Sequence, residues 1–266
     1  MAELPKHAKV VVIGQGGIVG ASVVHHLIEE GWDDIVGLEK SAIPTDIGST
    51  SHASDFCYMT THDKLNVFTS TYSREFYKKR GNYIEIGGME VARKDDDERM
   101  LELIRKVGSG KAFGTNAHMI SAAEAKEKFP LLEESEIQGA LWDPDAGLVT
   151  PRSQKVAGDL VDEAVASGKL KAFAYTPATK ILVEDGVAVG VETPKGTIMA
   201  DYLVLCAGIW GSRSTTNPSP NTPRREERLF SLQFSRLRSL DICAYVASIK
   251  SIEHVSSTLQ STATLS

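Results

Sequence analysis

Three absences narrow the classes to which this 266-residue chain can belong. Its three cysteines, Cys57, Cys206 and Cys243, form neither a CxxC pair nor an even framework, which gives no support to a disulfide scaffold or a structural zinc site. No apolar run is long enough to cross a bilayer, and the N-terminus resembles neither a signal peptide nor an Arg-rich transit sequence. We therefore expect a soluble cytoplasmic protein with no membrane partner and no metal, with a mitochondrial location as the alternative.

Further absences concern catalysis and nucleic acid. No Gly-Lys-Ser/Thr follows the glycine-rich loop, which excludes a phosphate-binding P-loop, and no G-x-S-x-G nucleophile elbow occurs. The formal net charge is −6, and no basic stripe interleaved with aromatic residues is present in the body of the chain. Nucleic acid is therefore not expected as the main partner.

What is present is a strand, glycine loop, helix, strand and acid at the start of the chain. Lys9 to Ile13 is a β-branched run, a glycine loop follows, an amphipathic stretch ends at Gly31, and a second apolar run ends on Glu39. This is a βαβ unit of roughly 30 residues with an acid about 20 residues beyond the glycines. Glycines let the backbone approach a pyrophosphate, and the strand-end carboxylate accepts ribose hydroxyls. The opening therefore predicts a dinucleotide site with Glu39 as the acceptor.

The register of the glycine loop is open by one residue. Reading G-x-G-x-x-G from Gly14 places Val19 at the last position, and Gly20 comes one residue later. We expect Gly16, Gly17 and Gly20 to make the close approach, with Gly14 or Gln15 at the strand exit. The alternative is an ordinary glycine-rich turn with Glu39 as a solvated charge.

Residues 56–135 differ in character from this unit and are expected to form a separate layer over the nucleotide site. Ser121 with Glu124 three residues on is a capping-box pattern that predicts a short helix before Pro130. The expected elements here are helices over 65–79, 95–106 and 122–128 and strands over 83–85 and 87–92.

From about residue 136 the sequence pattern again resembles that of the nucleotide-binding unit at the start of the chain. We expect a turn over 142–147 that favours a structural role for Asp143 and Asp145, a helix over 153–167, a strand over 171–175, a hairpin of 180–184 with 187–192, and a strand over 202–206.

Residues 212–266 are rich in Ser and Thr and hold seven Lys and Arg against four Asp and Glu, so the net charge changes sign there. We interpret this tail as disordered or poorly packed helix.

Seven blocks in order carry a resemblance to a known family: VVIGQGGIVGASVVHHL, GWDDIVGLEK, GSTSHAS, IGGMEVA, AKEKFPLL, WDPDAGLV and GTIMADYLVLCAGIWG. Together they resemble the FAD-dependent D-amino-acid-oxidase-like oxidoreductases, in particular the branch of dimethylglycine dehydrogenase and oxidase with sarcosine dehydrogenase. The resemblance covers about residues 8 to 211. It implies an α/β fold, a Rossmann-like FAD-binding domain (1–55 and 136–211) with an inserted cap or substrate-domain segment (56–135).

The resemblance also implies FAD as cofactor and a role for single residues. In that branch the histidine of the GST-x-HA block carries covalent FAD, which corresponds to His52, and the AG-x-W block lies against the flavin. Imidazole is a good nucleophile when neutral, so a ring nitrogen against the flavin methyl group can add to it; the alternative is a solvated loop histidine. The predicted cofactor-binding residues are Gly14, Gly16, Gly17, Ile18, Val19, Gly20, Glu39, Lys40, Ser49, Thr50, Ser51, His52, Ala207, Gly208 and Trp210.

Two functions of different classes remain open. One is a flavoprotein that oxidises the CH–NH group of an N-methylated amine such as dimethylglycine or sarcosine, a small-molecule partner, with an unknown electron acceptor and unknown catalytic residues. The other is a truncated, non-catalytic FAD-binding fragment, and a nicotinamide-dependent dehydrogenase is a third reading. Because the tail does not resemble the sequence that follows the AG-x-W block in the family, we expect this chain to turn over amines poorly.

Overall fold

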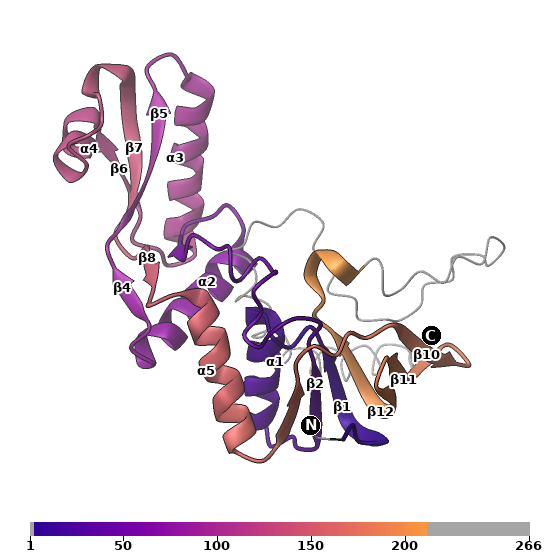
Figure 1. Cartoon of the computed structure of the whole chain (residues 1–266). Helices are drawn as coiled ribbons and strands as arrows, with labels where there is room; N and C mark the ends of the chain where they lie inside the picture. The colour runs from indigo at the N-terminus through magenta and orange to yellow at the C-terminus, as the bar shows by residue number, and fades with distance from the viewer. Residues whose placement is uncertain (1–2, 212–266) are drawn as a thin grey trace, which may run out of the picture. The chain divides into compact units, whose positions relative to one another are not determined.

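The computed structural model describes residues 3–211, which form two compact units (Figure 1). Residues 3–53 and 152–211 form the first unit, and residues 54–151 form the second. Both units combine helices with sheet, which confirms the predicted α/β class. The prediction made for 212–266 concerns residues outside the described part of the chain.

A six-stranded sheet in the order β10-β11-β12-β1-β2-β9 is the frame of the first unit. β12, β1, β2 and β9 run parallel, and β10 and β11 extend the sheet antiparallel from β12. The bounds are β1 His7–Ile13, β2 Ile35–Leu38, β9 Leu170–Phe173, β10 Lys180–Glu184, β11 Val187–Thr193 and β12 Gly196–Leu205. The expected hairpin is present with one end extended by one residue, and the expected strands at 171–175 and 202–206 are present with ends shifted by one to six residues.

Two helices, α1 (Ile18–Glu29) and α5 (Ser153–Ala166), pack against each other in this unit, and a short 3-10 helix, η2 (Gly208–Trp210), follows β12. All four residues of β2 are buried, as expected for a parallel strand covered on both faces. Apolar side chains of five strands form one core cluster: Ala8, Val11, Ile13, Val36, Leu38, Phe173, Val191, Ile198, Ala200 and Leu205.

The second unit contains two antiparallel three-stranded sheets, β3-β8-β4 and β5-β7-β6. α3 contacts β5 and β7, and Leu103 and Val107 of α3 pack with Ala92 and Leu141. The bounds are β3 Phe56–Cys57, α2 Lys64–Lys79, β4 Tyr83–Glu85, β5 Gly88–Arg93, α3 Asp97–Ala112, β6 His118–Ser121, α4 Ala122–Lys128, η1 Glu134–Glu136, β7 Ile137–Asp143 and β8 Gly147–Val149.

The boundary between the units differs from the one expected from the sequence. Residues 136–151 were assigned to the returning nucleotide domain, yet they lie in the second unit, because β7 pairs with β5 and β6 and β8 pairs with β3 and β4. The return to the first unit therefore begins at Arg152, directly before α5.

Candidate functional site

The glycine loop leaves β1 through a backbone conformation that favours glycine. Gly14 has φ +84°, and a Cβ there would lie 2.5 Å from the carbonyl oxygen of Cys206, at the end of β12. Its N–H donates to the carbonyl of Leu38, at the end of β2, at 2.8 Å. Gly14 therefore occupies the strand exit, at the carboxyl ends of three neighbouring strands, where open α/β sheets bind ligands.

Gly20 brings α1 against this strand exit. A Cβ on Gly20 would lie 2.3 Å from the carbonyl oxygen of Gly14 and 2.6 Å from Cα of Gln15, both of them backbone atoms. A Cβ on Gly16 would meet the side chain of Glu39 at 2.8 Å, whereas one on Gly17, the N-cap of α1, would have its nearest neighbour at 3.5 Å. Gly14, Gly16 and Gly20 are thus the positions where the protein itself leaves no space for a side chain.

Gln15 is the non-glycine residue inside this loop. It is fully buried, and its amide oxygen and nitrogen have no hydrogen-bond partner among the described residues. It packs over Gly37 of β2, where a Cβ would lie 2.7 Å from Cγ of Gln15. The sequence indicated Gln15 only as a candidate for the strand exit, and a buried amide next to a strand glycine has no local sequence signal.

Glu39 follows β2, and its side chain contacts the glycine loop. Its side chain is 6% exposed, Oε2 accepts the N–H of Gly16 at 3.1 Å, and Oε1 accepts the N–H and the hydroxyl of Ser41 at 3.1 and 3.3 Å. A buried carboxylate needs such donors, because burial without hydrogen bonds is costly. The predicted acid and the predicted glycine loop are therefore in direct contact.

The segment after Glu39 folds back over the start of α1. The N–H of Thr45 donates to the carbonyl of Gly16 at 2.9 Å, and its carbonyl accepts the side-chain amide of Gln154, from α5, at 2.8 Å. The hydroxyls of Ser41 and Thr45 lie 3.0 Å apart. Ser41, Thr45 and Gln154 were not predicted as site residues, because no spacing rule connects them with the glycines.

Gly48–His52 forms a turn that follows Thr45. Thr50 is buried, and its Oγ1 accepts the N–H of Ile18, the first residue of α1, at 3.0 Å. His52 is exposed, and its Nδ1 lies 3.0 Å from the carbonyl oxygen of Gly48 and 3.0 Å from Oγ of Ser51. A carbonyl only accepts, so the bond to Gly48 assigns the proton to Nδ1 and leaves the lone pair of a neutral ring on Nε2.

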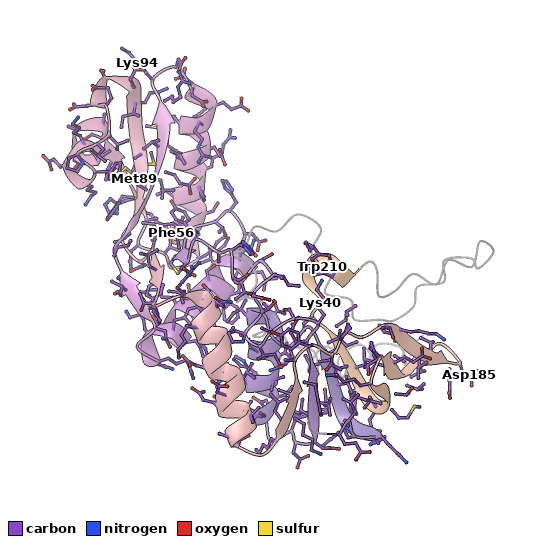
Figure 2. The ribbon with its side chains drawn as sticks, viewed as in Figure 1. Lys40, Phe56, Met89, Lys94, Asp185 and Trp210 are labelled. Carbon is purple, nitrogen blue, oxygen red and sulfur yellow. The ribbon has the colours of Figure 1, made fainter. Side chains whose placement is uncertain are left out.

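The residues after β12 form the remaining predicted block. Ala207 packs against the core cluster, Gly208 has φ +54°, and Trp210 is partly exposed. Figure 2 shows Lys40 close to Trp210, and Nζ of Lys40 lies 3.0 Å from the centroid of the Trp210 ring, a cation–π contact. Burial raises the pKa of the neighbouring Cys206 thiol to about 12, so this thiol is protonated and is not a nucleophile at neutral pH.

Asp143 and Asp145 belong to the second unit, in the turn that the sequence predicted to be structural. Asp143 is fully buried and accepts the backbone N–H groups of Met59 and Thr60 at 3.2 and 2.9 Å. Asp145 pairs with Arg74 at 3.2 Å and accepts the amide of Asn116 at 2.7 Å. Both carboxylates are thus engaged in holding loops and a helix of this unit.

Residues 3–211 contain neither a cluster of metal-ligating side chains nor a membrane-spanning helix. Within that range no group of three or more His, Cys, Asp or Glu side chains is placed to hold a metal ion. No described helix has the length and apolarity that crossing a membrane requires.

Comparisons with known proteins match the glycine loop, the acid and the blocks that follow. The model of a family described as DAO, FAD dependent oxidoreductase, matches residues 9–242. Human sarcosine dehydrogenase is 32% identical over 222 residues, which are 79% of this chain and 23% of that protein. The mouse pyruvate dehydrogenase phosphatase regulatory subunit is 32% identical over 214 residues, 78% of this chain and 24% of that protein. The chain thus spans about a quarter of the length of these curated relatives.

The fold has close counterparts among solved structures. L-proline dehydrogenase from P. horikoshii superimposes with a TM-score of 0.72 at 29% identity, over 79% of this chain and 55% of that one. Glycine oxidase from Geobacillus kaustophilus gives a TM-score of 0.64 at 23% identity, over 79% and 57% of the two chains, a likeness of fold.

Proposed function

This chain belongs to the family of FAD-dependent oxidoreductases, and from that premise we propose that it oxidises the CH–NH group of an N-methylated amine such as sarcosine or dimethylglycine. Relatives at 27–32% identity include proteins named sarcosine dehydrogenase, dimethylglycine dehydrogenase and 4-methylaminobutanoate oxidase. All three names refer to secondary or tertiary amines that carry a methyl group on nitrogen. This shared chemistry supports the substrate class.

The observation that carries the proposal is the contact of buried Glu39 with the N–H of Gly16 at the carboxyl edge of the sheet. The residues here fit FAD on three counts. Gly16 and Gly20 keep side chains away from the loop, α1 begins there without an acidic residue in its first turn, and Oε2 of Glu39 retains a lone pair for a ribose hydroxyl. A carboxylate repels the 2′-phosphate of NADP but accepts unphosphorylated ribose.

Each group of this chain then has a defined part. The N-terminal end of α1 offers N–H groups and a positive dipole end to the pyrophosphate, and Glu39 orients the ribose. Trp210, after β12, presents an aromatic face, and Lys40, after β2, presents a positive charge. FAD supplies the acceptor for the hydride that leaves the C–H next to nitrogen, and water then hydrolyses the resulting imine. These residues do not identify the electron acceptor that reoxidises the flavin.

His52 is proposed to hold FAD covalently through Nε2. The bond to the carbonyl of Gly48 keeps the proton on Nδ1, so the neutral ring directs its lone pair from the other nitrogen. His52 would hold the flavin by a bond from this nitrogen to the ring methyl carbon; one proton would leave the methyl group and one would leave Nδ1, and dioxygen would take up the two electrons and both protons as hydrogen peroxide. A covalent link of this kind raises the oxidising power of the cofactor.

A second candidate is a protein that binds FAD without turning over an amine. The observation that favours it is the relative named a regulatory subunit of pyruvate dehydrogenase phosphatase, which matches this chain as well as sarcosine dehydrogenase does. Both candidates share the cofactor site, and they differ in whether an added amine reduces the bound flavin.

A flavin titration tests the shared site. We expect Glu39→Ala to weaken FAD binding by about 1–3 kcal/mol, roughly fivefold to 150-fold, since the hydrogen bonds of a buried carboxylate are lost. Glu29→Ala, an exposed carboxylate at the far end of α1, serves as control and should bind FAD as the wild type does. Equal affinity of Glu39→Ala and wild type would contradict the site.

Anaerobic addition of sarcosine or dimethylglycine to the FAD-loaded protein then separates the two candidates. Loss of the flavin absorption supports amine oxidation. A flavin that stays oxidised with both amines, in a protein that binds FAD normally, supports the second candidate instead.

A further inference from the structure

One hydrogen bond joins the Gly48–His52 turn to the helix that begins the cofactor site. Oγ1 of Thr50 accepts the N–H of Ile18 at 3.0 Å, across 32 positions of sequence. The N-cap residue Gly17 makes no side-chain cap, and Thr50 supplies from a distant turn an acceptor for the first N–H of α1, one of the N–H groups that a helix leaves without a partner of its own. Both partners are buried, with Thr50 7% and Ile18 5% exposed, so water does not replace this bond without movement of the turn.

The same turn holds His52. The N–H of Ser51 donates to the carbonyl of Gly48 at 3.2 Å, the N–H of His52 donates to that of Ser49 at 3.3 Å, and Nδ1 of His52 lies 3.0 Å from the Gly48 carbonyl oxygen. Among the hydrogen bonds of residues 3–211, none joins His52 directly to α1. The described contacts therefore connect its ring to the start of the helix through the turn and through Thr50.

We propose that Thr50 is a positioning residue: by capping α1 from the turn, it orders Gly48–His52 and so holds Nε2 of His52 available for covalent attachment of FAD. This inference rests on the proposed attachment at His52. The buried hydroxyl of Thr50 would thus hold the nitrogen that bonds the flavin in register with the pyrophosphate end of the site, in addition to the bond between Thr45 and Gly16.

A matched threonine in the same unit separates positioning from stability. Thr193 is 8% exposed, and its Oγ1 accepts the N–H of Lys195 at 3.1 Å and donates to the carbonyl of Gly196 at 2.8 Å, in the turn between β11 and β12. Thr193→Val thus removes a similarly buried hydroxyl from the first unit without touching the turn that carries His52.

The experiment compares wild type, Thr50→Val, Thr50→Ser and Thr193→Val. Two readouts need no cofactor: amide hydrogen exchange of Ser51 and His52, and the ¹⁵N NMR signature of the His52 tautomer. The third is the rate at which acid-stable flavin forms with added FAD. For Thr50→Val we expect roughly tenfold faster exchange at both amides, a loss of the Nδ1–H preference, and attachment about tenfold slower, the scale of one lost buried hydrogen bond. Thr50→Ser restores all three, and Thr193→Val changes none of them.

The outcomes separate this inference from the function on which it rests. If wild type forms no acid-stable flavin, the attachment at His52 is wrong, while exchange and tautomer still decide the role of Thr50. If Thr50→Val matches Thr193→Val in all readouts, Thr50 is only structural and the inference is overturned. Should Thr50→Val not fold, the wild type decides: the amide of Ile18 must open together with those of Ser51 and His52, and independent exchange would contradict the proposal.

Discussion

The two units of this chain are stabilised in different ways. In the first unit, a sheet with a buried parallel centre brings together loops that are far apart in sequence, and their polar groups satisfy one another: Gly16 with Glu39, and Ile18 with Thr50. In the second unit, helices begin with their own caps and ion pairs link neighbouring elements, as at Glu90 with Arg99 and Lys106. Long-range hydrogen bonds thus build the proposed cofactor site, whereas the second unit adds locally capped helices and ion pairs to long-range bonds such as those of Asp143.

The largest expected effect is at a glycine of the first unit. Gly20→Ala places a Cβ against the backbone of Gly14 and Gln15, which cannot rotate away, and should cost about 3 kcal/mol of unfolding free energy and abolish FAD binding. Gly108→Ala in α3 meets nothing within 4 Å and should stabilise its helix by about 0.5–1 kcal/mol. Urea unfolding of both variants measures this, and equal effects would erase the difference between the units.

Next in size is the charge cluster of the second unit. Glu90 contacts Arg99 at 2.5 Å and also pairs with Lys106, whose side chain is only 14% exposed. Glu90→Gln removes this carboxylate from both cations, of which Arg99 keeps Glu102, and should lower the unfolding free energy by about 1–3 kcal/mol. Asp95→Asn, which removes the exposed partner of Arg93, is the control and should change it by less than about 0.5 kcal/mol. A loss in Asp95→Asn equal to that in Glu90→Gln would show that burial does not distinguish the two pairs.

The cap of α4 tests whether the loss of one helix cap in the second unit affects only its own helix. Ser121 caps α4 by accepting the N–H of Glu124 at 3.2 Å, while the side chain of Glu124 accepts the N–H of Ser121 at 2.8 Å. Ser121→Ala should cost about 1 kcal/mol, seen as faster amide exchange confined to α4. Faster exchange in α3 as well would mean that this cap acts beyond its own helix.

The smallest expected effect is a dependence on pH. Hydrogen bonds from Arg74 and Arg99 hold the pKa values of Glu85 and Glu102, respectively, below the ordinary range. A lowered folded-state pKa contributes stability above the unfolded value of about 4.3, and this contribution disappears as pH falls through the folded pKa. The protection factors of amides in α2 and α3 should therefore decrease slightly below about pH 4.3, only slightly because both carboxylates are exposed. The double variant Glu85→Gln/Glu102→Gln should remove this decrease, and an unchanged profile would contradict it.

Local patterns predicted much of this molecule, because their causes lie within a few residues. The capping box at Ser121, the hairpin of β10 and β11 and the βαβ opening all follow from short spacings. The helix expected over 95–106 instead begins at Asp97 and runs to Ala112, since Asp96 is its N-cap and the helix continues through Gly108 and Gly110.

Contacts across long sequence distances were beyond local patterns. Nothing near Thr50 indicates that it caps a helix 32 residues earlier, and nothing near Thr45 indicates its bond to Gly16. The second unit ends at residue 151 and not at the expected residue 135 for the same reason: β7 and β8 pair with earlier strands, and their own sequence does not indicate these partners. The glycine loop and Glu39 could be predicted as a pair only because the βαβ unit has a known length.

We propose that the glycine loop, Glu39 and the Gly48–His52 turn form an FAD site in which His52 bonds the flavin. The most direct measurement is acid precipitation of the FAD-treated protein followed by mass spectrometry of the peptide that contains residues 41–64. The control is His118→Ala, since His118 is also exposed with Nδ1 3.1 Å from a backbone carbonyl oxygen. Flavin should stay on this peptide in wild type and His118→Ala and be absent from His52→Ala. Flavin that is lost from all three on precipitation, or that remains bound in His52→Ala, would contradict the account.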